Sequence, residues 1–446
     1  MRSSAGVSAA VDLGRAHAPW LLVVAFVVLL PAEPLFNVPL LVAAAAGLVA
    51  LVRDRTVVAH PAWRTAALVY ACVVVPMVVA LPDAVDPGES ARKAASFALL
   101  PLAAGWLGVT LGPRGLHRVL VACYLVATAW GLDTVVQLVA GRDVFGFPYD
   151  GDGRLTGVFH PQFSLGIVLA SLAPLWLEGA RRLSAAGRLG TLAWIGVPAC
   201  LAGIALSGSR ASWLTLLLAL TAFVGHRLLA GEGRALLRPA LLAAAVAGLV
   251  AVGGAMVVPG AAERASALVA GRVTSATGLL DADRQRIDAA LSYRLSIWET
   301  AVDVFRSHAF NGVGPRGFRD VYAEHAGPDD FWMARDPNRL PTHPHQLALE
   351  IAAETGGVGV VGYLALLAVV GWRALGALRA RCDAGVAAWV AVGLALLPIN
   401  AHMAFYGNVL SSLNCVLIAI ALGAWPGRLG PSETTTRATA LAPRSD

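Results

Sequence analysis

Long apolar runs alternate with short polar loops along most of the chain. Several runs approach the roughly 20 residues that a helix needs to cross about 30 Å of hydrocarbon. A transmembrane barrel would instead show alternating strands of about ten residues. The pattern predicts an all-α polytopic membrane bundle of about 12 transmembrane helices. The expected spans lie near residues 18–31, 36–52, 65–81, 95–111, 117–140, 161–178, 190–207, 211–226, 239–258, 346–371, 385–403 and 408–425.

A large polar segment interrupts this pattern between predicted spans 9 and 10. Within it, residues 288–308 show helical periodicity, with apolar side chains on one stripe and acids on the other. We expect this helix to lie flat or to pack its apolar face on the mouth of the bundle. That stripe holds Leu291, Trp298, Ala301, Val302 and Phe305. The predicted organisation is spans 1–9 (residues 1–258), a partly helical loop domain (259–344), spans 10–12 (345–426) and a disordered tail (427–446).

Charge is distributed asymmetrically along the chain. Only 14% of residues are charged, against about 25% in soluble domains, and 57% are hydrophobic. Most arginines fall in loops on one predicted side of the bundle, and the acidic loops and the large polar segment fall on the other. By the positive-inside rule, both termini are expected to be cytoplasmic and the polar segment to lie outside. The net charge of +6 therefore reflects orientation rather than nucleic-acid binding.

The same topology bears on the choice between an enzyme and a transporter. No internal repeat is apparent. A twelve-span transporter built from two similar halves usually carries its long loop in the middle of the chain, on the cytoplasmic side. Here the long loop follows the ninth span and is expected outside, which weighs against a transporter.

Arg294 stands on the apolar side of the predicted helix 288–308, beside Leu291 and Trp298 rather than with the acids. A buried guanidinium needs an anionic partner. That partner could be an acidic side chain of the same chain. It could also be a phosphate group, whose oxygens fit the planar guanidinium fork.

Arg210 follows Ser207, Gly208 and Ser209 in a short outer loop between predicted spans seven and eight. These residues predict a sharp turn into a helix N-terminus, which is a natural site for an anion. The alternative is an arginine that extends its charged end to the membrane interface. Further candidates for a basic cavity, or else loop charges and interface anchors, are Arg92, Lys93, Arg154 and His160.

His343 and His345 flank Pro344 where the chain re-enters the membrane. A histidine there could act as a general base or as a cation toward a leaving phosphate, or it could bond to backbone at the helix start. Two histidines do not complete a zinc site. Glu350 and Glu354 lie more than a quarter-turn away from His345 on the predicted helix. We therefore expect neither a metal nor a cofactor.

Glu350 and Glu354 are acids within an otherwise apolar span. Acids in such positions are functional candidates by default, but they could also sit at the interface and help to place the span. Gly356 falls under His345 again after three helical turns. It would let another helix or a lipid chain approach closely.

Four stretches of this chain together resemble the O-antigen ligase and polymerase superfamily. They are Ser-Gly-Ser-Arg (207–210), Tyr-Arg-Leu-Ser-Ile-Trp (293–298), His-Ala-Phe-Asn-Gly-Val-Gly-Pro-Arg-Gly-Phe (308–318), which contains Arg316, and His345 followed by Gly356. The topology is similar too, with about twelve spans and a large outer loop near the C-terminal end. The resemblance covers roughly residues 150–375 well and the rest by hydropathy alone. One departure is Gln346, where relatives often have Asn.

The resemblance implies a metal-independent glycosyltransferase of the bacterial inner membrane. Such an enzyme moves a glycan from a polyprenyl-diphosphate carrier to an acceptor hydroxyl at the outer face, by single displacement with inversion. It implies that Arg210 and Arg294 bind the diphosphate and that His345 is the base, with the lipid tail along the bundle near Gly356. Candidate supporting residues are His343, Arg154, Glu350, Glu354, Gly356 and Arg316.

Three functions stay open at this point. The first is a ligase that joins finished polysaccharide to a lipid A–core acceptor, with a related variant that glycosylates protein. The second is a polymerase that joins repeat units on the carrier. The third is a transporter or flippase that uses its arginines only to hold the lipid-linked glycan.

Overall fold

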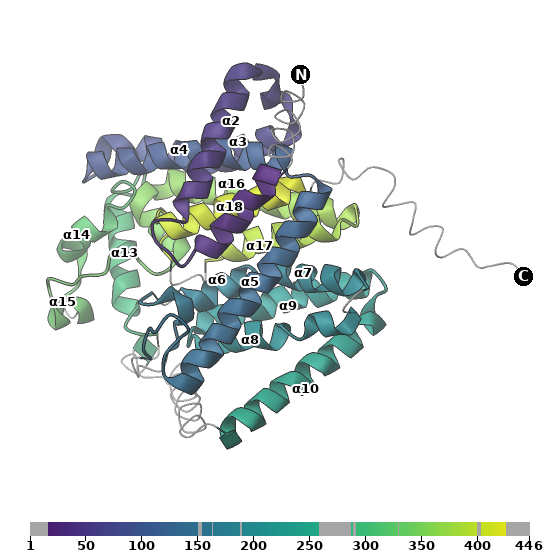
Figure 1. Cartoon of the computed structure of the whole chain (residues 1–446). Coiled ribbons are helices and arrows are strands. Elements are labelled where there is room, and N and C mark those ends of the chain that lie inside the picture. Colours follow the sequence, from purple (N-terminus) through teal and green to yellow (C-terminus); the bar gives the residue numbers. More distant parts are fainter. Residues whose placement is uncertain are drawn as a thin grey trace, which may run out of the picture.

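The computed structural model describes most of the chain as a bundle of helices (Figure 1). The described residues are 17–149, 154–162, 164–187, 190–257, 287–288, 291–328, 330–398 and 403–424. Within these ranges the regular structure is helical and no strand forms, so the all-α prediction is confirmed there. The predicted disordered tail and residues 259–286 of the predicted loop domain lie outside them. Both chain termini also lie outside the described residues, so their predicted cytoplasmic location stays a prediction.

The helices follow the apolar runs closely. An apolar helix at His17–Leu29 is followed by α2 (Asn37–Arg53), α3 (Pro61–Ala80), α4 (Pro87–Thr110) and α5 (Pro113–Ala140). The middle of the chain forms α6 (Leu165–Ser171), α7 (Ala173–Ala185), α8 (Val197–Leu206), α9 (Arg210–Leu229) and α10 (Gly233–Val257). The polar segment forms α13 (Leu295–Ser307), α14 (Phe318–His325) and α15 (Phe331–Arg335), and the chain returns through α16 (Leu347–Arg379), α17 (Asp383–Ala395) and α18 (Asn408–Gly423).

Several helix starts are encoded locally by proline. Pro61, Pro87 and Pro113 are the first residues of α3, α4 and α5. The fixed φ of proline suits the first helical turn, and its missing N–H would have no partner within the helix at that position. At α4 the carboxylate of Asp86 also accepts the N–H of Glu89 at 2.9 Å. These helices therefore begin where their sequence indicates.

Five helices are long and apolar enough to cross a membrane: Pro61–Asp83, Pro87–Thr110, Pro113–Ala140, Arg210–Leu229 and Leu347–Arg379. Shorter apolar helices pack among them, including α2, α17 and α18. The chain is thus a helical membrane protein. The count of about 12 spans and the outer position of the polar segment remain predictions.

Two groups of helices make up the bundle. In one group α4 packs against α2, α3 and α18, and in the other α5 packs against α7 and α8. The long helix α16 contacts α3 and α17, and α13 packs against its first half at Ala353. Helices α13, α14 and α15 lie together at one side of the bundle in Figure 1. The polar segment therefore covers one end of the membrane helices.

The helix predicted at residues 288–308 is shorter than expected. It begins at Leu295, because Ser292 and Tyr293 adopt left-handed backbone conformations with φ of 61° and 57°. The predicted apolar stripe is also wrong apart from Ala301. The buried face consists of Ile297, Thr300, Ala301 and Val304, which pack with residues of α14 and with Ala353 of α16. The expectation that this helix packs on the bundle is confirmed, but the face that packs is not the predicted one.

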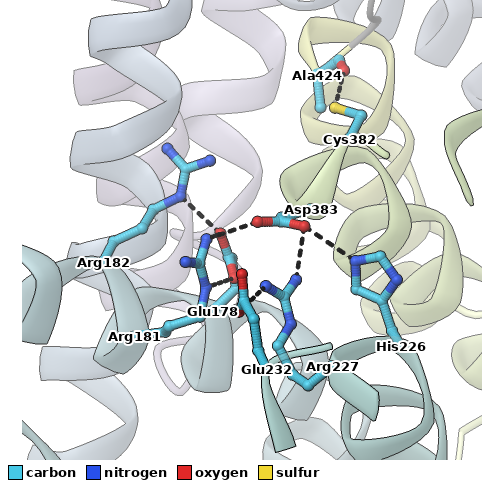
Figure 2. A network of polar contacts seen from close by, with 9 residues as sticks. All are labelled: Glu178, Arg181, Arg182, His226, Arg227, Glu232, Cys382, Asp383 and Ala424. Carbon is cyan, nitrogen blue, oxygen red and sulfur yellow. Dashed lines mark hydrogen bonds and ion pairs between the residues drawn. The ribbon is translucent and has the colours of Figure 1, made fainter. Parts of the chain in front are cut away.

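An ion network joins α7, α9 and α17 away from the polar segment (Figure 2). Glu178 of α7, 1% exposed, accepts from Arg181 at 2.7 Å and from Arg182 at 2.8 Å. Asp383 at the start of α17 accepts from Arg181 at 2.9 Å and from Arg227 of α9 at 2.7 Å. His226 and Glu232 complete the network, through Asp383 and Arg227 respectively. The arginines that the sequence analysis treated as orientation signals thus also fasten α7, α9 and α17 together.

Candidate functional site

A cavity of about 500 Å³ lies beside the polar segment and collects three of the predicted site residues. Arg154, Arg294 and His345 all line it, although they are distant in sequence. The remaining wall includes the residues that lead into α18 and the start of that helix. We call this space the cation cavity.

Arg294 is positioned by the turn that precedes α13. It is the N-cap residue of that helix and not part of its face, so the predicted place among Leu291 and Trp298 is corrected. Asp288 closes the turn, because its carboxylate accepts the N–H of Leu295 at 2.9 Å and its carbonyl accepts the N–H of Tyr293 at 2.7 Å. This closed turn fixes the backbone from which the Arg294 side chain enters the cavity.

The charge of Arg294 is not compensated by an acid among the residues that the structure describes. Burial lowers its pKa to about 10, and the neighbouring cations Arg154 and Arg210 add to that effect. No carboxylate in the described ranges pairs with its guanidinium. Of the two partners considered from the sequence, an acid of the same chain is therefore not found there. Because a pKa near 10 leaves the group charged at neutral pH, the cavity favours an anion.

Arg154 and Arg210 come together through backbone contacts. The N–H of Leu155 donates to the carbonyl of Leu206 at 3.1 Å, which holds the stretch after Arg154 against the end of α8. Gly208 then turns the chain with φ of 72°, and the hydroxyl of Ser209 accepts the N–H of Ser212 at 3.2 Å. The predicted turn into a helix N-terminus is confirmed, with Arg210 as the first residue of α9. Arg210 lies close enough to interact with Arg154 and Arg294 but does not itself line the cavity.

His345 lies in a left-handed turn before α16, with φ of 54°. Its ring centroid is 4.0 Å from that of His343. The indole of Trp298 donates to the carbonyl of Pro344 at 3.1 Å, so α13 holds this turn in place. The helical-wheel relation predicted between His345 and α16 is wrong, because His345 is outside the helix.

Gly356 was expected to let another helix or a lipid chain approach α16, and the structure shows a different partner. Its φ of 62° and ψ of −159° interrupt α16, and this region of backbone space is essentially restricted to glycine. The backbone of residues 309–314 fills the break: the N–H of Gly357 donates to Ala309 at 2.8 Å, and the N–H of Gly314 donates to Glu354 at 2.9 Å. A Cβ at Gly356 would lie 2.4 Å from the carbonyl carbon of Phe310. The close approach is therefore made by the 308–318 motif, not by another helix or a lipid chain.

Glu350 and Glu354 are buried at 1% and 0% exposure and do not line the cation cavity. Glu350 accepts the N–H groups of Phe405 and Tyr406 at 2.9 and 3.2 Å. Glu354 accepts the N–H of Arg316, which has a left-handed φ of 71°, at 2.5 Å. Of the two interpretations of these acids, the geometry favours support over contact with a ligand. They hold the turn before α18 and the 308–318 motif against α16.

The four remaining candidates have different surroundings. Lys93 donates to the side-chain oxygen of Asn408 at 2.7 Å, and Asn408 lines the cation cavity, so Lys93 borders it. Arg92 is exposed and pairs with a glutamate one turn before it. His160 stacks on an aromatic ring and does not line the cavity. Arg316 does not line it either.

Sequence reasoning missed six polar or aromatic residues of the cavity wall, which are Glu33, Gln162, Ser164, Ser292, Trp332 and Asn408. Glu33 and Gln162 both line it, and the amide of Gln162 donates to the carboxylate of Glu33 at 3.3 Å. Trp332 and Asn408 line it from α15 and α18. Glu33, Gln162 and Asn408 are polar residues near the ends of apolar runs, a feature that many other positions share, and Trp332 lies within the polar segment.

No group of three or more His, Cys, Asp or Glu side chains in the described ranges is arranged to hold a metal ion. The absence of a metal and of a cofactor remains a prediction.

The geometry defines a helical membrane protein with a cation-lined cavity at one end of its bundle. Residues 192–364 match the family model described as O-antigen ligase. This region contains Arg210, Arg294, His345 and Gly356, so the resemblance inferred from the four motifs is confirmed: the chain carries a domain of the O-antigen ligase superfamily. No curated protein matches the chain significantly.

Proposed function

We propose that this protein is an O-antigen ligase-like glycosyltransferase. It moves a glycan from a polyprenyl-diphosphate carrier to a hydroxyl of a lipid A–core acceptor. Membership of the superfamily supports a lipid-linked glycan as donor and a glycan as acceptor. The predicted topology supports placement in the bacterial inner membrane, with the cation cavity on the periplasmic side and both termini in the cytoplasm.

The observation that carries the proposal is the charge of Arg294, which no acid of the described residues compensates, in the cavity that it shares with Arg154 and His345. A diphosphate leaving group gains negative charge as its bond to the sugar breaks. Fixed cations that already point at that position stabilise the transition state without reorganising. In this scheme Arg294 contacts the diphosphate, with Arg154 and Arg210 adding to the positive potential.

His345 supplies the base in the same scheme. Its imidazole takes the proton from the acceptor hydroxyl, and the hydroxyl oxygen attacks the anomeric carbon of the donor sugar. The bond from that carbon to the diphosphate breaks as the new glycosidic bond forms, so the carrier leaves as the polyprenyl diphosphate. The configuration at the anomeric carbon is inverted because one displacement occurs. The indole of Trp298, bonded to Pro344, supports the position of this base. The scheme uses no metal.

The experiment compares a strain that lacks the gene with strains carrying wild type, His345→Ala or the control His160→Ala. His160 is a histidine of the same predicted face that does not line the cavity. Lipopolysaccharide gels and extracts of carrier-linked glycan are analysed in parallel. We expect bare core, with long polymer retained on the carrier, in the deletion and His345→Ala strains and a normal ladder with His160→Ala.

Other outcomes reject parts of the proposal. Core bearing one repeat unit in the deletion strain would identify a polymerase. Glycan that stays on the cytoplasmic face in the deletion strain, but reaches the periplasmic face equally with wild type and with His345→Ala, would indicate a transporter. A normal ladder in the His345→Ala strain would remove the catalytic role of this residue.

A further inference from the structure

A second cavity, of about 260 Å³, lies between α2, α4 and α18. Leu40 and Ala44 of α2 and Leu100 and Ala103 of α4 form much of its wall. Nothing in the chemistry proposed above uses this space. We call it the lateral cavity.

The lateral cavity and the cation cavity are adjacent and share one wall residue. Asn408, the first residue of α18, lines both of them. Its side chain accepts from the ammonium group of Lys93 at 2.7 Å, which places another cation at this junction. Because Asn408 belongs to both walls, a molecule in the cationic space lies next to the lateral cavity.

The lateral cavity changes polarity along its length. Its polar side chains include Asn37 and Asn408 at the first residues of α2 and α18, with Ser412 donating to Asn37 at 2.8 Å. Further along α2 the wall becomes Leu40 and Ala44. The polar end is the one that adjoins the cation cavity. This gradient fits an amphiphile whose anionic head lies at Arg294 and whose tail points into the bundle.

The apolar part of the lateral cavity has a side opening and a closed end. Leu41 and Leu99 line it while 59% and 46% exposed, so the space reaches the outer surface of the membrane helices. Beyond Ala44 the space ends, because Gly47 packs against the backbone of Leu102 so closely that a Cβ would lie 2.3 Å from the carbonyl oxygen. An apolar chain that entered could leave sideways into lipid but could not continue down between α2 and α4.

We propose that the lateral cavity binds the tail of the lipid-linked substrate at its first isoprenoid units, next to the diphosphate. This inference rests on the proposed function. It places the tail between α2, α4 and α18, whereas the site near Gly356 is filled by the 308–318 motif. The substrate is then held at two separate points, the diphosphate by cations and the tail by apolar contact.

The test separates tail binding from head binding, using the full chain in phosphatidylcholine nanodiscs. Dissociation constants are measured for inorganic diphosphate and for geranylgeranyl diphosphate, with empty nanodiscs to subtract partitioning into lipid. Two variants fill the lateral cavity: Ala44→Phe from its wall and Ser96→Trp from its exposed rim. The control is Val42→Phe, because Val42 is 50% exposed on α2 and does not line the cavity. Thermal unfolding shows that each variant is folded.

We expect wild type and Val42→Phe to bind the prenyl compound at least about tenfold more tightly than inorganic diphosphate, as burial of a few methylene groups would give. Both filled variants should lose this preference and bind inorganic diphosphate as wild type does. A preference that persists in both filled variants would overturn the inference, as would its absence in wild type. Absence of the preference together with a tightly held phospholipid, detected by native mass spectrometry and lost in Ser96→Trp, would assign the cavity to bilayer lipid instead.

Arg294→Ala tests the proposed function independently in the same assay. Loss of inorganic diphosphate binding supports the head site whatever the filled variants show. If Arg294→Ala binds inorganic diphosphate like wild type, the head site of the proposed function fails. The tail site would still be decided separately, by comparing how much more tightly wild type and the filled variants bind geranylgeranyl diphosphate than inorganic diphosphate.

Discussion

Helix α9 carries cations at both of its ends, and the groups that surround the two ends differ. Arg210 at its first residue is close to Arg154 and Arg294. His226 and Arg227 in its last turn contact Asp383. At 1.5 Å per residue the two groups are separated by roughly 25 Å, about the thickness of a membrane core.

The ion network at the far end balances its charges locally. Glu178, Glu232 and Asp383 face three arginines and one histidine, and Arg227 is buried to 1% exposure with two acidic partners (Figure 2). At the cavity end Arg294 is surrounded by other cations, and no acid of the described ranges pairs with it. A protein that only needed to be stable would not retain such a charge, since desolvation is costly without a partner. The comparison teaches that the compensated cluster holds helices together, whereas Arg294, with no acidic partner in the described ranges, is ready for an anion.

The largest expected effect is on stability at the compensated end. Asp383→Asn should cost roughly 3–5 kcal/mol of unfolding free energy, because the buried Arg227 and the half-buried Arg181 both lose that carboxylate. The melting temperature of the purified protein, followed by intrinsic fluorescence, measures it. Asp320→Asn is the matched control, since Asp320 is 38% exposed and lies 3.6 Å from Arg319. It should cost less than about 1 kcal/mol. Equal melting temperatures for the two variants would contradict a structural role for the network.

The second prediction compares one arginine from each end. Arg294→Ala should lower the transfer rate by about 10²–10³, the usual effect of removing one group that stabilises transition-state charge. Its melting temperature should stay the same or rise, because no acid loses its partner. Arg227→Ala should do the reverse: it leaves Asp383 and Glu232 without this cation and lowers the melting temperature, while folded molecules keep most of their transfer rate. If Arg294→Ala destabilised the protein as much as Arg227→Ala, the two ends would not differ in the way described.

A third prediction concerns the backbone that supports the cavity end. Gly356→Ala should cost at least about 1–3 kcal/mol, because alanine is strained at φ of 62° and its Cβ would meet the carbonyl of Phe310. Gly371→Ala is the control in the same helix, with no atom within 4 Å of the added methyl group. It should stabilise the helix by roughly 0.5–1 kcal/mol. Thermal unfolding distinguishes them, and a tolerated Gly356→Ala would mean that the 308–318 motif does not fix the break in α16.

The smallest effect is a pH dependence at Arg294. Its protonated form binds anions, so affinity is fully present below its pKa of about 10 and is lost as pH rises through that value. Sulfate is a suitable probe because its own charge is constant over this range. Arg294→Lys should move the loss to lower pH, because burial and the two cations act on an ammonium whose ordinary pKa is about 10.4. Unchanged sulfate binding in wild type up to pH 12 would contradict a pKa of Arg294 lowered by burial and by the neighbouring cations.

Local signals in the sequence were sufficient for the class of fold and for the main cations. Apolar runs of membrane length and proline at helix starts depend on neighbouring residues, so they can be read without a structure. Arg210 and His345 were found because short motifs around them interrupt the apolar pattern. Arg294 was found because it was placed on the apolar side of a predicted helix, although the structure makes it the N-cap. Arg154 was a weaker candidate, and only the contact of Leu155 with Leu206 brought it beside Arg210.

Tertiary structure alone decided which of these residues share one space. The wheel relation between His345 and Gly356 failed because it assumed one continuous helix, whereas a left-handed residue and a break in α16 depend on contacts with α13 and the 308–318 motif. Glu350 and Glu354 were functional candidates as acids in an apolar span, yet their partners are backbone N–H groups up to 56 residues away. The ion network likewise joins α7 to α17 across 202 residues. The sequence by itself thus determined most helices, the proline-marked starts of several of them and the presence of excess cations, which are set by near neighbours. Which charges are compensated and which face a cavity depends on residues that only folding brings together.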